Sequence, residues 1–372
     1  MKVVKAGESH GEAMVGILTD VPSGIVVNKL NINKLLRERN LALGRSERQK
    51  IESDKVNLIT GVRNGLTLGG NVAVVIKNAV HKNYEAIMHP FEADTQSLKI
   101  TALRPGHADL PGISRWGFND ARNVMEGASA RNTCVDTALG AIAISMLEEL
   151  GVKIAVSVKM LGNAISKKEY SFEQNLKNTY PAFSRDKAFI TACKEQIEIA
   201  KVQGESLGGV VQIVVSPLKK GFGSYVPEKR VDALIAQLLM QIQAVKGIYF
   251  GENPFDLNMP ATTYMGSIVK EANGLKITNS YSGGIDGGMT NGDYIKITVA
   301  IKPIPTTAKG VHTVNLENGE DAFSARERAD VTAVFGVCPV LKAVTAIALT
   351  QAVTERLGCD NMTAIIKRYN DL

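Results

Sequence analysis

Aromatic residues and cysteines are scarce in this chain of 372 residues. Phenylalanine, tyrosine and tryptophan together make up 5% of it, and the single tryptophan is Trp116. Because 45% of the residues are hydrophobic, the core must be aliphatic and rich in alanine. The four cysteines lie far apart, without CxxC or metal-ligand spacing, at Cys134, Cys193, Cys338 and Cys359. This spacing predicts buried free thiols in a reducing cytoplasm and argues against a metal site.

The sequence also has no long apolar run and no common nucleotide-binding motif. A membrane-spanning helix needs about 20 apolar residues, and MKVVKAGESHGE at the start has no apolar segment before a cleavage site. We therefore expect neither a membrane span nor a signal peptide. Since GxGxxG and GxxxxGKS/T are missing, a Rossmann site or a P-loop is not expected. No linker or low-complexity segment divides the chain, which predicts a single domain over residues 1–372.

The net charge of +6 comes mostly from one short segment. Residues 30–50 hold six basic and two acidic side chains, a local net charge of +4. One hypothesis is a basic protein that binds nucleic acid. The few aromatic side chains for base stacking and the shortness of the segment argue against it. The alternative is that this basic segment binds a phosphorylated small molecule.

Two alanine-rich segments without a wide polar face predict buried helices. The first is 125–150, which Gly151 can end, and the second is about 328–357, which Pro339 should kink or break early. Other periodic runs predict strands at 13–18, 72–76, 153–160, 208–217 and 294–301, and helices at 32–39, 185–202 and 230–245. Because strands and helices do not alternate regularly, we expect an α+β fold with antiparallel sheets around central helices.

Two of the five histidines lie in segments rich in glycine and charge. In RPGHADLPG (104–112), the prolines predict a stiff turn around His107, hardly a helix or a central strand. In AGESHGE (6–12), His10 lies between two glutamates, but HGE is not the HExxH of a zinc site. Each histidine is either a catalytic imidazole or an ordinary polar loop residue.

Several arginines are candidates for a phosphate clamp, because a guanidinium binds phosphate oxygens through two parallel hydrogen bonds and stays charged. They are Arg39, Arg45, Arg48, Arg104 and Arg131. The alternative is a solvated helix face.

Three further segments suit ligand binding. YSGGIDGGMTNGD (281–293) is dense in glycine, as needed where backbone approaches a flat ligand or turns sharply. KPIPTT (302–307) should be extended and rigid, with a lysine and threonines as donors. RERAD (326–330) puts Arg328 and Asp330 at the start of a predicted helix, where Asp330 could be only a helix cap.

Together and in this order, these segments resemble the chorismate synthase family. The matching stretches are AGESHGE, LGRSERQKIESD, TGVRNGLTLGG, RPGHADLPG, ASAR, GESLGGVVQIVV, AVKG, SGGIDGGMTNGD, KPIPT and RADV. They span nearly the whole chain, and ten motifs in register are far more than chance supplies.

The resemblance implies a β-α-β sandwich with central buried helices, working as a homotetramer. The family converts 5-enolpyruvylshikimate 3-phosphate to chorismate, the last step of the shikimate pathway. The reaction is a 1,4-anti elimination of phosphate and a ring hydrogen that needs reduced FMN without net redox change. With no appended domain, this chain would depend on an external flavin reductase, with NADPH as the indirect reductant.

The resemblance also implies roles for particular residues. His10 and His107 match the histidines that protonate the reduced flavin and the departing phosphate, and Asp330 matches an acidic residue that assists proton removal. The implied FMN contacts are Gly127, Ala128, Ser129, Gln243, Ala244, Gly287, Lys302, Pro303, Ile304, Pro305, Thr306 and Arg328. Substrate or NADPH would contact Arg39 and Arg45, with Arg48, Arg104 and Arg131 as further anion ligands.

The chain departs from the family pattern at four positions. Gly127 stands where arginine is common and Asn132 where glutamate is, which removes one cation near the expected ligands. Phe118 replaces a frequent histidine, and Glu205 a usual aspartate. Two further alternatives stay open: an FMN-dependent oxidoreductase, which would consume NADPH stoichiometrically, and a catalytically silent relative, for which Gly127 is the hint.

Overall fold

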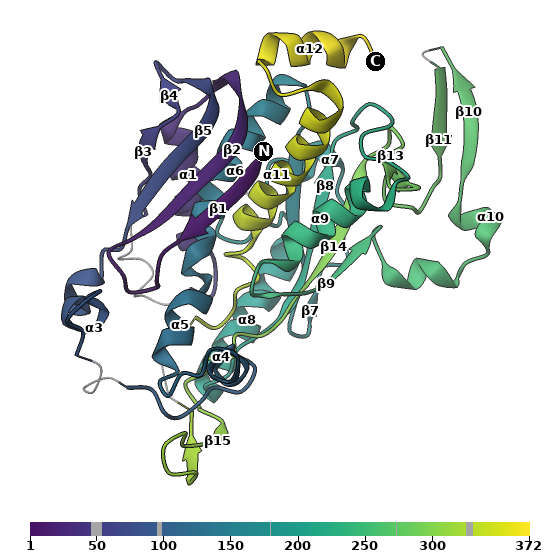
Figure 1. The fold of residues 1–372 in the computed structure, drawn as a ribbon. Helices are drawn as coiled ribbons and strands as arrows, with labels where there is room; N and C mark the ends of the chain where they lie inside the picture. Colours follow the sequence, from purple (N-terminus) through teal and green to yellow (C-terminus); the bar gives the residue numbers. More distant parts are fainter. Residues whose placement is uncertain (46–53, 95–98, 179, 273, 325–329) are drawn as a thin grey trace.

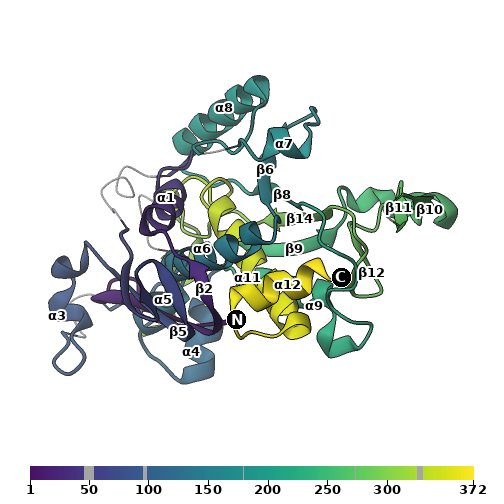
Figure 2. The same cartoon turned by 90° about the horizontal axis from the view of Figure 1, so that it is seen from above.

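Two antiparallel sheets enclose a layer of helices in this computed structural model, which describes the chain except residues 46–53, 95–98, 179, 273 and 325–329 (Figures 1 and 2). The first sheet has the order β1-β2-β5-β3, with β4 beside β5. Its strands are β1 (Lys2–Ala6), β2 (Ala13–Val26), β3 (Asn57–Thr60), β4 (Val62–Arg63) and β5 (Leu66–Lys77). The second sheet has the order β7-β6-β8-β14-β9. Its strands are β6 (Ile154–Leu161), β7 (Ala164–Ile165), β8 (Gly209–Val215), β9 (Val245–Phe250) and β14 (Ile295–Ile301).

Helices α6 (Thr133–Glu149) and α11 (Cys338–Leu357) form the centre of the layer and pack directly on each other. A Cβ atom added to Gly140 would lie 2.4 Å from the Cβ of Ala343, so the small residues allow the two backbones to approach closely. The other side of α6 covers β2, and α11 packs against β6. Since both helices are apolar on nearly all sides, they bury themselves between the two sheets.

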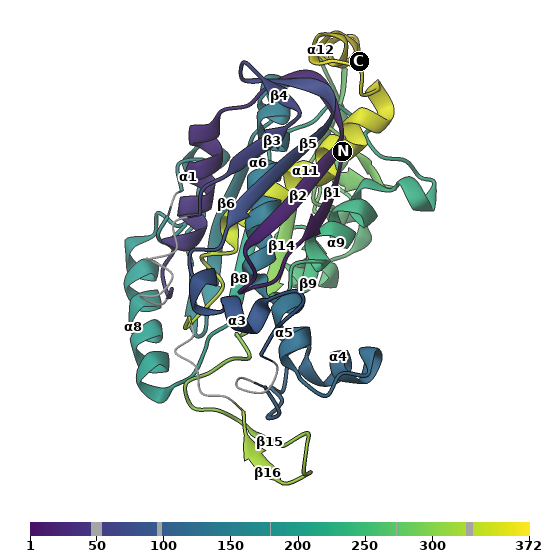
Figure 3. The same ribbon diagram turned by 60° about the vertical axis from the view of Figure 1, so that its left-hand side comes forward.

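The remaining elements surround this core. Figure 3 shows α4, α5 and the β15–β16 hairpin together at one end of the molecule. The helices are α1 (Lys29–Asn40), α3 (Glu85–Met88), α4 (Asp109–Trp116), α5 (Arg122–Ala128), α7 (Phe172–Asn175), α8 (Lys187–Gln203), α9 (Val231–Met240), α10 (Ala261–Tyr264) and α12 (Met362–Asn370). The outer hairpins are β10 (Ser267–Glu271) with β11 (Gly274–Thr278), β12 (Ile285–Asp286) with β13 (Met289–Thr290), and β15 (His312–Val314) with β16 (Asp321–Phe323).

The expected α+β class is confirmed, and each predicted strand overlaps one of the observed strands. Both long helices are shorter than predicted. The first is broken at Ser129, whose backbone is extended, so α5 ends before it and α6 begins at Thr133. The second begins only at Cys338, because residues 330–337 are not helical, and Pro339 lies in its first turn. The break expected at this proline is therefore confirmed.

The core is aliphatic, as composition predicted, and its largest fully buried aromatic side chains are Phe222 and Phe335. All four cysteines are free, but Cys359 is exposed, so the prediction of buried thiols is wrong for this residue. It follows the last turn of α11, where the chain returns to the surface. Across the described ranges, no helix combines the length and apolar character needed to cross a membrane.

Candidate active site

His10 lies in the loop between β1 and β2, against α5. Its Nδ1 atom is 2.9 Å from Oε1 and 3.0 Å from Oε2 of Glu126, and its backbone N–H donates to Oε2 at 2.9 Å. Arg122, one turn earlier in α5, donates to the same carboxylate at 3.2 Å. The ring of Tyr84 packs on the imidazole, with 4.0 Å between the ring centroids. His10 is therefore held at Nδ1 and on one face.

Glu126 is ionised in this setting. Burial raises the pKa of its carboxyl, but the hydrogen bonds and charge of His10, with the charge of Arg122, more than offset this and leave the pKa below its usual value. Its side chain is 3% exposed. A buried carboxylate thus faces His10.

His107 lies in the turn that precedes α4. Its Nδ1 atom is 2.6 Å from Oδ1 of Asp109, and Arg104 donates through Nε and Nη2 to the two oxygens of Asp109, at 2.9 Å each. The carboxyl of Asp109 is fully buried, which alone raises its pKa, but the hydrogen bonds from His107 and Arg104 reverse this and hold the pKa well below its usual range. This second histidine therefore also contacts a buried carboxylate that an arginine neutralises.

The predicted stiff turn is confirmed for residues 104–108. The second half of RPGHADLPG instead forms the first turn of α4, so the expectation that the segment is not helical is wrong there. Pro111 is the third residue of this helix, a position whose N–H has no partner within the helix, so its missing donor breaks no hydrogen bond.

Asp330 forms an ion pair with Arg45, whose Nη1 atom donates to Oδ2 at 2.6 Å. The backbone next to it is also fixed, because Val331 donates to the carbonyl of Gly44 at 2.9 Å. A Cβ atom on Gly336 would lie 2.5 Å from the Arg45 guanidinium, so this glycine makes room for it. The alternative in which Asp330 caps the buried helix is wrong, since α11 begins at Cys338.

The segment 302–306 contacts the His107 turn. The backbone N–H of Lys302 donates to the carbonyl of Ala244 at 2.9 Å, and its ammonium donates to the carbonyl of Gly106 at 2.9 Å. Next to Ala244, the amide of Gln243 donates to the carbonyl of Ser129 at 3.3 Å. A continuous set of contacts therefore runs from the His107 turn, through 302 and 243–244, to the end of α5 beside Glu126 and His10.

The same segment also reaches the stretch of chain that follows Asp330. The hydroxyl of Ser206 donates to the carbonyl of Ile304 at 2.7 Å, and the next residue, Leu207, donates to the carbonyl of Val331 at 2.8 Å. Residues 302–306 thus join the surroundings of all three predicted catalytic residues. This segment includes the predicted ligand contacts Pro303, Pro305 and Thr306. A Cβ atom on Gly106 would lie 3.5 Å from the Cβ atom of Pro305, so the segment packs closely on the His107 turn.

Arg39 and Arg131 share the carboxylate of Asp54, which the sequence did not single out. Arg131 lies 2.5 Å from Oδ1 and Arg39 lies 3.4 Å from Oδ2. The same nitrogen of Arg39, Nη1, also donates to Asn40, while Nε donates to Thr133 and Nη2 to the backbone carbonyl of Ala130. Burial lowers the pKa of Arg39, and the nearby charge of Arg45 lowers it further. Direct contact of Arg39 with a ligand would require some of these bonds to break.

The other predicted ligand contacts have different positions. Gly127 and Ala128 end α5, and a Cβ atom on Gly127 would meet no heavy atom within 4 Å. Gly287 lies in the turn between β12 and β13, away from α4 and α5 (Figures 1 and 2). It is not brought together with the histidines in this chain. Arg48 and Arg328 lie outside the described residues.

Two buried polar atoms of this region have no hydrogen-bond partner among the described residues: Oε1 of Gln243 and Nε of Arg45. Buried polar groups are usually satisfied, so an acceptor and a donor here suit a polar ligand. Lys302 adds a cation whose pKa is lowered by partial burial and by the charge of Lys246. The site therefore offers a cation, a donor and an acceptor to an anionic, polar ligand.

Sequence reasoning missed Glu126, Tyr84 and Asp54. Glu126 follows Arg122 by four residues, the spacing of an ion pair along a helix, and this was an available signal. Nothing in the sequence pairs Glu126 with His10, because 116 positions separate them. Tyr84 and Asp54 carry no local signal.

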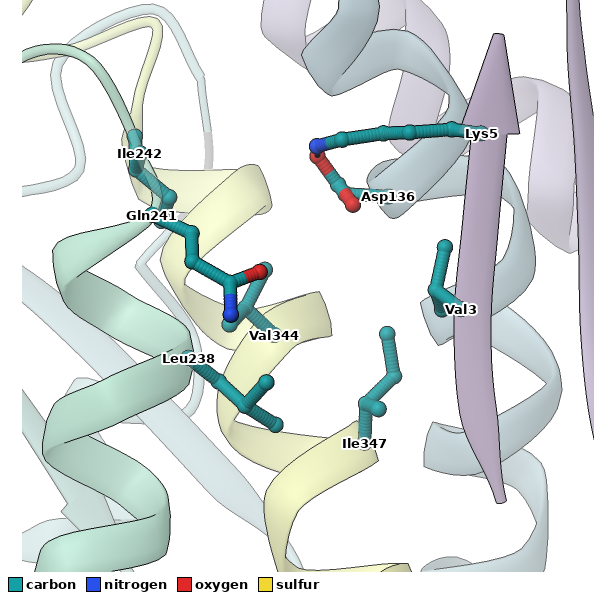
Figure 4. Close-up of a pocket in the computed structure, with 8 residues that line it drawn as sticks. All are labelled: Val3, Lys5, Asp136, Leu238, Gln241, Ile242, Val344 and Ile347. Atoms are coloured by element: carbon teal, nitrogen blue, oxygen red, sulfur yellow. Dashed lines mark hydrogen bonds and ion pairs between the residues drawn. The ribbon is translucent and has the colours of Figure 1, made fainter.

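A separate cavity between β1, α6, α9 and α11 has a volume of about 40 Å³ (Figure 4). Lys5 and Asp136 point toward each other at its edge, 2.5 Å apart, and Gln241 lies across from them. Burial raises the pKa of Asp136, although Lys5 opposes this. The space holds only a few water molecules, which excludes it as a flavin site.

Comparison with known proteins gives a single result. The family model described as "Chorismate synthase" matches residues 1–354. The chorismate synthase of Desulfitobacterium hafniense (strain DSM 10664 / DCB-2) is 40% identical over 381 residues, which cover 100% of this chain and 98% of the relative. That of Caldicellulosiruptor saccharolyticus is 36% identical over 384 residues, covering 100% and 99%. A solved structure described as "Crystal Structure of Chorismate Synthase" superposes with a TM-score of 0.77 at 29% identity, covering 100% of this chain and 96% of that one.

Proposed function

Since this chain belongs to the chorismate synthase family of carbon–oxygen lyases, which serve aromatic amino-acid biosynthesis, we propose that it performs the family's reaction with reduced FMN. That reaction is the 1,4-anti elimination of phosphate from 5-enolpyruvylshikimate 3-phosphate to give chorismate. One observation carries the proposal: residues 302–306 connect the surroundings of His10, His107 and Asp330 through hydrogen bonds.

The residues present suit a flavin mononucleotide. The unpartnered Oε1 of Gln243 can accept a hydrogen bond from a flavin ring N–H, and the ammonium of Lys302 can offset negative charge on the reduced ring or its phosphate. Ser129 and Ala244, each hydrogen-bonded into the same network, complete the surface on which it would rest. When bound, reduced FMN supplies electron density to the substrate as the bond to phosphate weakens.

The protein supplies protons and fixed charges. His10 and His107 hold the protons that the flavin and the departing phosphate need, the general acid–base role that histidine most often has in enzymes. Asp330, held in place by its ion pair with Arg45, serves as a base close to the 302–306 segment. Both histidines are immobilised through Nδ1, which keeps the proton donors in place while the ligands bind.

The substrate carries a phosphate and two carboxylates, and several cationic side chains of the site can bind these anionic groups. We assign Arg45, Arg104 and Lys302 to its neighbourhood, with Arg48 as a further ligand. Arg39 and Arg131 contribute positive charge through the Asp54 cluster. Positive charge near an anionic small molecule needs no nucleic-acid partner.

We further propose that the enzyme is a cytoplasmic homotetramer served by an external flavin reductase, which uses NADPH. Four free cysteines support a reducing compartment. An exposed apolar arm around α10 and the β10–β11 hairpin supports association between chains (Figure 1), and its exposed side chains include Phe255, Leu257, Met265, Ile268 and Leu275. Sedimentation should give a particle of four chains, and a monomer at micromolar concentration would contradict this.

The decisive assay is anaerobic incubation with dithionite-reduced FMN and 5-enolpyruvylshikimate 3-phosphate, following phosphate release and chorismate absorbance. We expect one phosphate per chorismate, without stoichiometric NADPH consumption. Replacing His10 or His107 by alanine should lower turnover at least tenfold while circular dichroism stays unchanged. NADPH oxidised in step with product would indicate an oxidoreductase instead, and no phosphate release by the wild type would end the proposal.

A further inference from the structure

Both active-site histidines sit in the same kind of three-residue unit. In each, Nδ1 contacts a carboxylate, and an arginine donates to that same carboxylate. One unit is His10, Glu126 and Arg122, and the other is His107, Asp109 and Arg104. The carboxylate side chains are 3% and 0% exposed. The two units come from different loops, so their likeness is not a consequence of one local motif.

The 2.6 Å contact between His107 and Asp109 fixes where the ring proton lies. Arg104 donates to both oxygens of Asp109 and its backbone N–H donates to Oδ2 at 3.0 Å, so this carboxyl stays ionised and can only accept. A deprotonated Nδ1 would place two acceptors 2.6 Å apart, which is repulsive. Nη2 of Arg104 lies 3.1 Å from Nδ1 and could donate to an unprotonated ring nitrogen, but the ionised oxygen of Asp109 is closer, at 2.6 Å, and requires a donor there. Nδ1 of His107 therefore carries a hydrogen.

Glu126 imposes the same state on His10. Its carboxylate already receives the backbone N–H of His10 and a guanidinium N–H of Arg122, which keep it ionised. Nδ1 lies within 3.0 Å of both carboxylate oxygens, and only a protonated Nδ1 makes this contact attractive. Tyr84 packs on the ring and opposes its rotation.

We propose that Glu126 and Asp109 are positioning residues that hold the neutral rings of His10 and His107 in the Nδ1–H tautomer, so that each ring gains or loses its second proton at Nε2. The inference rests on the proposed function for the claim that these rings transfer protons. An isolated neutral imidazole favours the opposite tautomer, with hydrogen on Nε2, which could not accept a proton there. The carboxylates thus determine which atom of each ring does the chemistry.

The tautomers can be read directly by magic-angle-spinning NMR of the full-length protein labelled with nitrogen-15 histidine. The chain has five histidines, so single substitutions assign each ring. At a pH where the rings are neutral, we expect His10 and His107 to show a protonated Nδ1 and an unprotonated Nε2. The opposite pattern in the wild type overturns the proposal without any variant.

Two near-isosteric variants test the cause. In Glu126→Gln and Asp109→Asn, an amide N–H can donate to Nδ1, which a carboxylate cannot do. We expect the affected ring to move toward the Nε2–H form and kcat to fall at least tenfold, with KM within about threefold. Glu126→Asp and Asp109→Glu keep the charge, and each should retain more of the wild-type tautomer and kcat than the amide. A tautomer that does not move, or a kcat that does not fall, contradicts the proposal.

The chain offers a matched control. His312 lies 3.2 Å from Asp321, but both side chains are exposed, at 64% and 86%. Asp321→Asn should leave kcat and the signals of His10 and His107 unchanged. If the wild type released no phosphate from the substrate, the proposed function would fail, while the ring nitrogen signals would still decide the tautomers.

Discussion

The carboxylate of Asp54 pairs with two buried arginines, Arg39 and Arg131, so its removal should be costly. We consider Asp54→Asn, which keeps the shape of the side chain and removes its charge. The side chains of Arg39 and Arg131 are only 5% and 9% exposed, so water cannot replace the lost carboxylate easily. Asn40, which also donates to Asp54 at 3.1 Å, would lose a charged acceptor.

The magnitude follows from the burial. Removing one partner of a buried ion pair typically costs about 3–5 kcal/mol, because the remaining charge is left uncompensated. Two guanidinium groups depend on Asp54, so we expect a loss in this range. For a chain of this length it corresponds to roughly 4–6 °C in melting temperature.

Urea denaturation followed by circular dichroism measures this loss. Asp360→Asn is the control, because Asp360 pairs with Arg368 at 3.5 Å and both side chains are about half exposed or more. Exposed pairs contribute at most about 1 kcal/mol, so the control should change stability little. If the two variants lost the same small amount, Asp54 would not hold the cluster together, and Arg39 and Arg131 would be available to bind ligands.

Three further predictions concern stability. Because the pKa of Asp109 is depressed on folding, its ionised form stabilises the protein above the unfolded pKa of about 4. The loss of unfolding free energy in Asp109→Asn should therefore be full at neutral pH and should shrink as the pH falls below that value. Urea denaturation at a series of pH values measures this. Gly127→Arg should change the unfolding free energy by less than about 0.5 kcal/mol, since a side chain there meets open space. Gly140→Ala should cost about 1–3 kcal/mol in the same denaturation assay, because its Cβ would overlap Ala343 in the contact between α6 and α11.

The strands and the fold class could be predicted because their signals are local. In β14, the alternation of buried and partly exposed residues follows from β-branched residues at every second position, and pairing with β8 and β9 only completes it. The break at Ser129 could not be predicted in this way. Its sequence suits a helix, but its extended backbone is favoured by contacts with Gln243, which lies 114 residues away.

In the candidate site too, contacts between residues close in sequence could be predicted, and contacts between distant residues could not. Arg104, His107 and Asp109 lie within six consecutive residues, so their mutual contact is suggested by the sequence itself. The partner of His10 comes from α5, and that contact exists only because α5 is folded back against the loop between β1 and β2. Local sequence therefore suggested the contact of His107 with Asp109, whereas the contact of His10 with Glu126 required the tertiary structure.

The charge of the site also differs from what a count of arginines suggests. Its described arginines are matched by nearly as many carboxylates: the arginines are Arg39, Arg45, Arg104, Arg122 and Arg131, and the carboxylates are Asp54, Asp109, Glu126 and Asp330. This set carries a formal charge of only +1, since each carboxylate offsets one guanidinium. Binding a trianionic substrate beside a flavin phosphate must then draw on Lys302, which forms no ion pair among the described residues. Replacing Lys302 by alanine should accordingly raise the KM for the substrate several-fold, because this variant removes a cation that no described carboxylate offsets.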